Sequence, residues 1–331
     1  MSQEYIGKFS EIGFALEDIR GTAESAPTKS AKKIEANFYK NVEKAEDESV
    51  VATVMDINKL RKTQEWYEGD VSMNLHADTI GYLLANIFGD VESAEEGGGY
   101  KHTFTQDEAI KRQSFTTFVK EGDVKQEKIA GTVVSTLSLS AEQDGYVSAD
   151  IGLIGRSGEA DTATFSYDKE YDFIGKDITI TIGDSKAQLD NGGTEIDVKS
   201  LTLDIDTGAE ADFVSEGEYT PHEIFQGNTN ISGSLELNYD GNTLYDLYNS
   251  DTAKYMRIEI KDDHDLGTNT NPTVQIDLHK VFVEDWSRSG GQDEVVTQDV
   301  TFRATYNEDE ATDPIWKAEV INSTDEYISE S

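Results

Sequence analysis

Several segments of the chain alternate between apolar and polar residues, which is typical of a β-strand with one buried face. In Thr132–Ser140, the side chains of Val133, Leu137 and Leu139 would share one face. The same alternation is found in Val198–Asp206, Val274–Val283 and Val295–Ala304. The chain is therefore expected to be mainly β, with antiparallel sheets that are each covered on one side.

Two segments have the apolar spacing of a short helix. Asp78–Gly89 carries four apolar residues at helical spacing, with Asp78 as the helix N-cap and Gly89 as the residue that ends it. Asn242–Asn249 has the same spacing over a shorter stretch. Polar stretches with glycine or acidic residues, among them Lys44–Ser49 and Glu92–Gly99, are expected to form loops.

The neighbourhoods of these two helices coincide when the sequence is shifted by 164 residues, the separation of Gly69 and Gly233. In each half, a strand leads into the helix and three further β segments follow. We therefore expect two tandem domains, residues 1–165 and 166–331, with the second a divergent duplication of the first. The equivalences are Val71, Met73 and Leu75 with Leu235, Leu237 and Tyr239, and Asp78 with Asn242.

The net charge of −38 is unusual for 331 residues. A surface this acidic repels nucleic acid, because phosphate binding requires Lys and Arg to displace counterions. It also disfavours binding to anionic membranes. Two interpretations remain open and are compatible: a halophilic host, whose salt screens the self-repulsion, or a surface past which DNA moves without sticking.

The chain contains no cysteine, which excludes disulfides and thiolate metal sites. No stretch approaches the roughly 20 apolar residues that a membrane helix requires. The first residues, Met1–Tyr5, lack the basic and apolar regions of a signal peptide. We expect a protein that is made and folded in a cytoplasm.

The sequence has few patterns that indicate a metal-binding or catalytic site, and none of them is specific. Asp262–Asp265 could offer oxygen ligands to a divalent cation, although a solvated acidic turn is the simpler interpretation. Asp204–Gly208 begins like a calcium loop but has Ser215 where the bidentate acid is required. The histidines, His76, His102, His222, His264 and His279, lack the helical spacing of a zinc site. We expect no catalytic, cofactor-binding or metal-binding residues and no enzymatic activity.

The passages Trp66–Gly89, Gly131–Ser140 and Tyr146–Leu153 resemble tail tube proteins, or major tail proteins, of long-tailed phages and archaeal tailed viruses. The resemblance implies tandem domains that are β-sandwiches or barrel-wall sheets, each with one flanking helix. Six such domains would close a ring around a channel, so a chain with two domains implies a homotrimeric ring with pseudo-sixfold symmetry. It also implies ring stacking, a place in the virion tail, and contacts with tail terminator, tape measure and distal tail proteins.

Genome DNA would pass through such a channel without specific binding. The polar face of Thr132–Ser140, and its counterpart around Gln275, Asp277 and His279, are the segments we expect to line the wall. The alternative interpretation, that these faces are simply solvated, stays open. A different hypothesis is a carbohydrate-binding or adhesive β-sandwich module, with Trp66, Trp286 and Trp316 as possible platforms. Packing within the fold or between subunits is the simpler role for these tryptophans. A hydrolase with paired carboxylates is a third hypothesis, which rests only on the abundance of acids.

Overall fold

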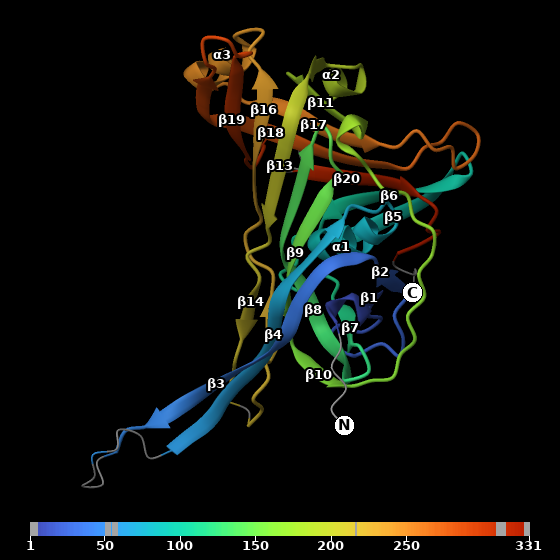
Figure 1. Ribbon diagram of the computed structural model, residues 1–331, viewed down its shortest axis with the longest axis vertical. Coiled ribbons are helices and arrows are strands. Elements are labelled where there is room, and N and C mark those ends of the chain that lie inside the picture. Colours follow the sequence, from blue (N-terminus) through green and yellow to red (C-terminus); the bar gives the residue numbers. More distant parts are fainter. Residues whose placement is uncertain (1–5, 50–53, 55–58, 216, 309–315, 328–331) are drawn as a thin grey trace.

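The computed structural model describes residues 6–49, 54, 59–215, 217–308 and 316–327 (Figure 1). Met1–Tyr5, considered above, lies outside the described residues. The protein is mainly β, as expected, and 18 of the described strands belong to one hydrogen-bonded network. None of the described helices is long and apolar enough to cross a membrane.

The elements of the first half begin with a short 3-10 turn and include one α-helix. They are η1 (Gly7–Phe9), β1 (Ser10–Leu16), β2 (Lys29–Ala31), β3 (Lys33–Asp47), β4 (Lys59–Asn74), α1 (Thr79–Phe88), β5 (Gly89–Glu96), β6 (Gly99–Gln106), β7 (Phe115–Glu121), β8 (Lys125–Glu142), β9 (Ser148–Gly155) and β10 (Ser157–Ala160).

The elements of the second half also begin with a 3-10 turn. They are η2 (Gly175–Asp177), β11 (Ile178–Gly183), α2 (Lys186–Asp190), β12 (Thr194–Ile196), β13 (Val198–Asp206), β14 (Glu210–Asp212), β15 (Glu223–Phe225), β16 (Asn230–Asn238), α3 (Thr243–Ser250), β17 (Lys254–Lys261), β18 (Thr273–Ser289), β19 (Thr297–Ala304) and β20 (Trp316–Asn322).

The two halves share one order of strand pairing, and every pair is antiparallel. In the first half the order is β2-β1-β7-β8-β9-β4-β3. In the second half it is β12-β11-β17-β18-β19-β16-β13. The long strands β8 and β18 each pass from one sheet of their half to the other. The core lies between these two sheets, and all ten residues of α1 are buried.

The halves meet along two lines. The C-terminal part of β8 pairs with β13, which joins eight strands in the order β3-β4-β9-β8-β13-β16-β19-β18. We call these strands the inner sheet. On the other side of the molecule, β6 of the first half pairs with β20 of the second. The β5–β6 hairpin has no counterpart in the second half, where α3 is followed by β17 after three residues.

The segment after β20 fastens the end of the described chain to the first half. Tyr327 is buried, and its hydroxyl donates to the carbonyl of Asp78 at 2.8 Å. The Asp78 carboxylate accepts from the backbone and hydroxyl of Ser323 and from the hydroxyl of Thr324. Asp78 therefore precedes α1 as predicted, but its side chain holds this segment and does not cap the helix.

The helix and strand predictions are largely confirmed, whereas two predicted loops are wrong. Lys44–Ser49 continues β3 as far as Asp47, and Glu92–Gly99 contains most of β5. Lys44–Glu46 of β3 and Glu92–Glu96 of β5 are exposed on both faces, so neither stretch has the alternation that marks a half-buried strand. Their pairing with β4 and β6 supplies the backbone hydrogen bonds. The outer parts of β3 and β4 form an arm that extends from the body (Figure 1).

Candidate functional site: the exposed face of the inner sheet

The inner sheet has one apolar and one polar face because its strands alternate with a period of two. In β13, Leu201, Leu203 and Ile205 are buried in the core. Thr202 and Asp204 point to the opposite face, and Asp204 is exposed. The same alternation in neighbouring strands makes this opposite face a continuous polar surface.

Small hydroxyl residues and acids dominate this surface. One cross-strand row runs through six strands of the inner sheet. Ser138 donates to the Asp204 carboxylate at 2.5 Å, and Ser72 donates to Asp150. The only cation of this row belongs to an ion pair, because Arg303 contacts Glu284 at 3.0 Å. The row consists of Ser72, Asp150, Ser138, Asp204, Ser232 and Arg303.

Further acids lie at equivalent positions of the same face, on β4, β13, β16 and β19. Short side chains leave the surface smooth, and the excess of carboxylates makes its potential negative. Such a surface repels phosphate and offers it no array of Lys or Arg. These acids are Asp70, Asp206, Glu236 and Asp299.

Of the two segments expected to line a channel wall, one lies on an exposed face and the other is buried. Ser138 and Ser140 lie on the exposed face of the inner sheet, as expected from the Thr132–Ser140 pattern. Asp277 and His279 are instead 3% and 1% exposed, in the part of β18 that pairs with β17 and β20. Arg257 balances the buried carboxylate of Asp277 with an Nε–Oδ1 distance of 2.7 Å, and this hydrogen bond raises the pKa of Arg257.

Both ends of the inner sheet are free edges. Among the described residues, β3 pairs only with β4, and residues 285–289 of β18 pair only with β19. Unpaired backbone groups at such edges are ready to pair with another chain. Alternation in the sequence marks β18 as a strand but does not indicate that β3 or β18 lies at an edge of the sheet.

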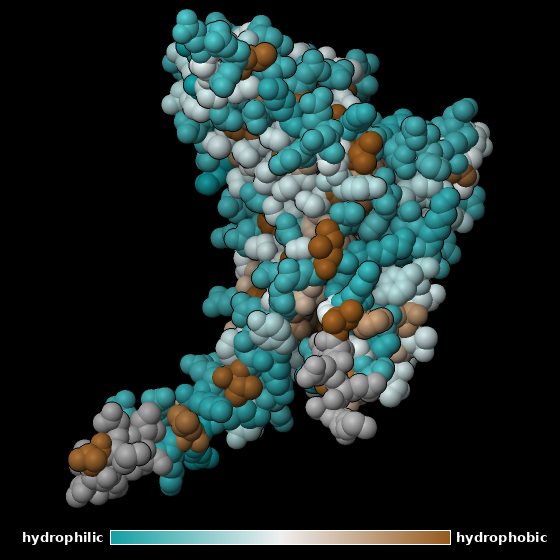
Figure 2. Space-filling view, viewed as in Figure 1, coloured by the Kyte–Doolittle hydropathy of each residue, from teal (hydrophilic) through white to brown (hydrophobic). Residues whose placement is uncertain are grey.

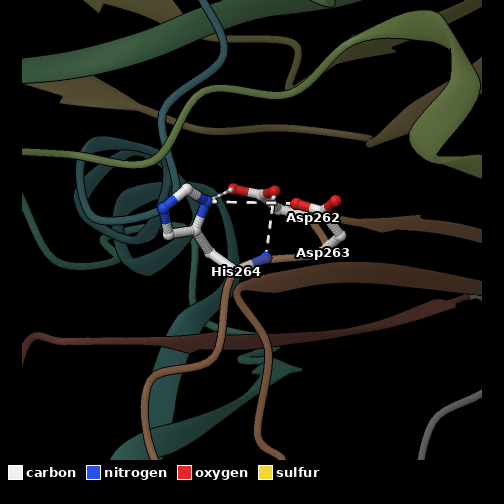
Figure 3. Close-up of side chains that lie close together, drawn as sticks. All are labelled: Asp262, Asp263 and His264. Carbon is white, nitrogen blue, oxygen red and sulfur yellow. Dashed lines mark hydrogen bonds and ion pairs between the residues drawn. The ribbon is translucent and has the colours of Figure 1, made fainter.

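The acidic loop between β17 and β18 brings three potential ligands together (Figure 3). His264 Nδ1 lies 3.7 Å from Asp262 and 4.0 Å from Asp263. Asp265 instead accepts from the backbone of Gly267 and Thr270 within the loop. Three ligands on one turn are fewer than the six to eight oxygens that Ca²⁺ takes, so we assign this cluster no function.

The other residues considered from the sequence have packing or structural contacts. Asp204 and Asp206 belong to strand β13 and not to a loop. His102 is buried, which lowers its pKa, although hydrogen bonds with Thr324 and Asn322 act in the opposite direction. His76 contacts Asp172 at 2.6 Å.

The three tryptophans pack against other aromatic rings. Trp316 is fully buried and stacks on Phe88 at 3.9 Å. Trp66 and Trp286 make edge contacts with Phe213 and Tyr245. Trp66 and Trp286 are half-buried, and these contacts favour a packing role for the three rings. The surface shown in Figure 2 is largely hydrophilic, with scattered hydrophobic residues.

Comparison with models of known protein families gives a match over most of the chain. A family model described as phage tail tube protein matches residues 8–304. The match runs from η1 to the end of β19, so it includes both halves and all eight strands of the inner sheet. A search of curated proteins gave no match.

Proposed function

The chain belongs to the phage tail tube protein family, and we propose that its copies form stacked rings whose channel conducts the viral genome. Membership makes it a structural protein of the virion tail, which assembles with itself and with other tail proteins. The observation that supports the channel is the inner sheet, which continues across both halves and has one acidic, small-residue face.

We propose that residues 1–165 and 166–331 are two tube domains related by duplication. The shared order of strand pairing supports this division. If each domain occupies one of six places in a ring, three copies complete the ring. Closure of a heterologous contact of this kind also removes the free edges of β3 and β18, which would otherwise invite aggregation.

The wall chemistry suits a channel for DNA. A duplex that moves quickly must not be held, and carboxylates repel its phosphates. We place the exposed face of the inner sheet toward the channel, with Asp150, Asp204 and Asp299 near the DNA. The tail terminator, tape measure and distal tail proteins are the proposed partners at the tube ends and in the lumen. Synthesis in the cytoplasm of a halophilic host completes the proposal.

Electron microscopy of the purified protein tests assembly. At low and high salt, we expect hollow rings or tubes, favoured by salt, with threefold class averages. A protein that stays monomeric at every concentration and salt level contradicts ring formation. Sixfold averages built from six chains contradict the trimer while leaving the tube intact.

Charge reversal tests the wall. Tubes of Asp150→Lys/Asp204→Lys should retain double-stranded DNA in a sedimentation assay at low salt, whereas wild-type tubes should not. Asp262→Lys/Asp263→Lys is the control, because it makes the same change in net charge in the β17–β18 loop, away from the inner sheet (Figure 1). Equal retention by the control and the wall variant would show that the inner face is not the DNA-facing surface.

A further inference from the structure

We infer that, along the inner sheet and the turn beside it, the contact between neighbouring copies repeats the register of the contact between the two halves of one chain. The C-terminal part of β18 in one copy would pair antiparallel with β3 of the next copy. The turn after β18 would cover the segment before β1 of that copy. This inference rests on the ring proposed above and adds the register of its subunit interface.

Equivalent residues can be assigned because the pairing irregularities occur at the same places in both halves. The β8–β9 pair shifts register between Val134 and Thr136, and the β18–β19 pair shifts between Val283 and Asp285. These bulges make Ser138 of β8 equivalent to Ser287 of β18. A bulge changes the direction of the side chains that follow it. Because both strands have their bulge at the same place, equivalent residues also face equivalent directions.

The same argument aligns β3 with β13. The β3–β4 pair shifts between Lys33 and Glu35, and the β13–β16 pair shifts between Val198 and Ser200. Tyr39 is therefore equivalent to Asp204. In β4 and β16, the equivalent residues Gly69 and Gly233 oppose Phe38 and Leu203, which supports the alignment.

The register within the chain then predicts the register between copies. Inside one chain, β8 pairs with β13 through Ser140 and Thr202, Ser138 and Asp204, and Thr136 and Asp206. Transposed to the free edges, the pairs between copies are Ser289 with Asn37, Ser287 with Tyr39, and Asp285 with Asn41. Each pair lies on the exposed face of the sheet.

The core side of the same edges is chemically complementary. Within the chain, Leu137 opposes Ile205 and Leu139 opposes Leu203. The equivalent pairs between copies are Trp286 with Lys40 and Arg288 with Phe38. Both pairs set a cation against an aromatic ring, which is an attractive arrangement, and neither sets like charges together.

The turn after β18 supports the inference with a second contact. Inside the chain, the β8–β9 turn touches the segment before β11: Gly175 N–H donates to Gly145 at 3.0 Å, and Tyr146 bridges Ile174. The connection between the paired residues Ser140 and Ser148 is as long as the one between Ser289 and Thr297. In addition, η1 precedes β1 as η2 precedes β11. The transposed bridge joins Val295 with Ile6.

The residues of this second contact are exposed in the single chain. Ile6 is 62% exposed and Val295 is 71% exposed, although both are aliphatic. A groove beside β3 is lined by Gly7, Ser10 and residues 33–39, and Ile34 in it is 67% exposed. Inside the chain, the backbone N–H of Gln143 in the β8–β9 turn donates to the carbonyl of Lys199. The residue equivalent to Lys199 is Ile34, so the transposed turn would occupy this groove. One second copy therefore covers both the groove and the exposed residues.

Disulfide trapping tests the register, because the chain has no cysteine of its own. Opposed residues of an antiparallel pair have Cα atoms close enough for a disulfide, whereas a shift of four residues separates them by about 13 Å. Assembled, oxidised Asn37→Cys/Ser289→Cys should run as covalent dimers and trimers without reductant. Asn41→Cys/Asp285→Cys should do the same.

The matched control is Asn41→Cys/Ser289→Cys, which uses two of the same positions out of register and should stay monomeric. Tubes that form without in-register cross-links, or with equal cross-linking of the control, overturn this inference and leave the tube proposal standing. A wild-type chain that never forms rings overturns both. If a cysteine variant fails to assemble, the register is read from cryo-electron microscopy of wild-type tubes: Tyr39 beside Ser287 supports the inference, and any other neighbour overturns it.

Discussion

Gly81 shows how a single side chain would disturb the contact between α1 and the end of the described chain. A Cβ atom at this position would lie 2.0 Å from the Tyr327 ring. Tyr327 is buried against Tyr82 and His102, so it cannot move aside freely. The glycine therefore serves close packing between segments that are far apart in sequence.

We predict that Gly81→Ala destabilises the protein by about 1–3 kcal/mol, the usual cost of overpacking a core. Alanine is more favourable than glycine in a helix by roughly 1 kcal/mol, so helix propensity alone would stabilise the variant. A loss of stability can therefore be attributed to the clash with Tyr327. Urea unfolding measures the change. Gly241→Ala is the control, because no atom lies within 4 Å of its added Cβ. A stabilised Gly81→Ala protein would contradict the packing described for Tyr327.

His102 gives a prediction about pH. Burial lowers its pKa below the ordinary 6.5, so the unfolded chain binds a proton at higher pH than the folded chain does. Its contribution to stability is therefore complete above pH 6.5 and declines as the pH falls below that value. An NMR titration of the ring should give a midpoint below 6.5 in the folded protein. The same histidine in urea is the reference, and a folded midpoint at or above that reference would refute the prediction.

At the scale of elements, the β17–β18 pair depends on a buried ion pair. The side chains of Arg257 and Asp277 are 15% and 5% exposed, and two hydrogen bonds join them. Removal of one partner leaves the other buried without its counter-charge, which typically costs 3–5 kcal/mol. Asp190 also contacts Arg257, at 2.8 Å, and reduces the loss of stability when Asp277 is removed.

We predict that Asp277→Ala lowers the free energy of unfolding by about 3 kcal/mol. Glu284→Ala on the same strand removes an exposed pair with Arg303 and should change it by less than about 1 kcal/mol. Chemical denaturation of the two variants gives the comparison. Equal effects would mean that the ion pair at Asp277 is not buried in solution.

The same strand shows what could and could not be predicted for the elements. Helix α1 was predictable because its apolar periodicity and Gly89 act locally. The polar positions of β18 were misassigned because Gln275, Asp277 and His279 alternate like an exposed face. The counter-charge that offsets the burial of Asp277 comes from the distant Arg257, which β17 brings alongside. Strand β5 was missed because pairing with β6, and not apolar burial, defines it.

At the scale of the whole molecule, the charge of −38 opposes association of copies. The Debye length falls from about 10 Å at 0.1 M salt to about 3 Å at 1 M. We predict that the protein concentration needed for assembly falls as sodium chloride rises over this range, as measured by sedimentation. Potassium chloride should act alike, because screening does not distinguish the two cations. Rings that dissolve as salt is added would contradict this prediction.

The acidic character of the proposed wall could be expected from composition, but its residues could not. Asp150 and Asp204 lie 54 positions apart in sequence and flank Ser138 in one row only because β9, β8 and β13 are neighbours. Strand order is a property of long-range pairing, which alternation within one strand does not encode. The free edges of β3 and β18 are visible for the same reason only in the folded chain.

The β5–β6 hairpin and its pairing with β20 occur at one of the two kinds of junction in the proposed ring. The three junctions within chains are then bridged by the polypeptide and by the β6–β20 pair. The three junctions between copies have neither. Such a ring would consist of three rigid chains joined by three weaker interfaces. When a tail bends or is heated, the interfaces between copies should separate first and release intact chains.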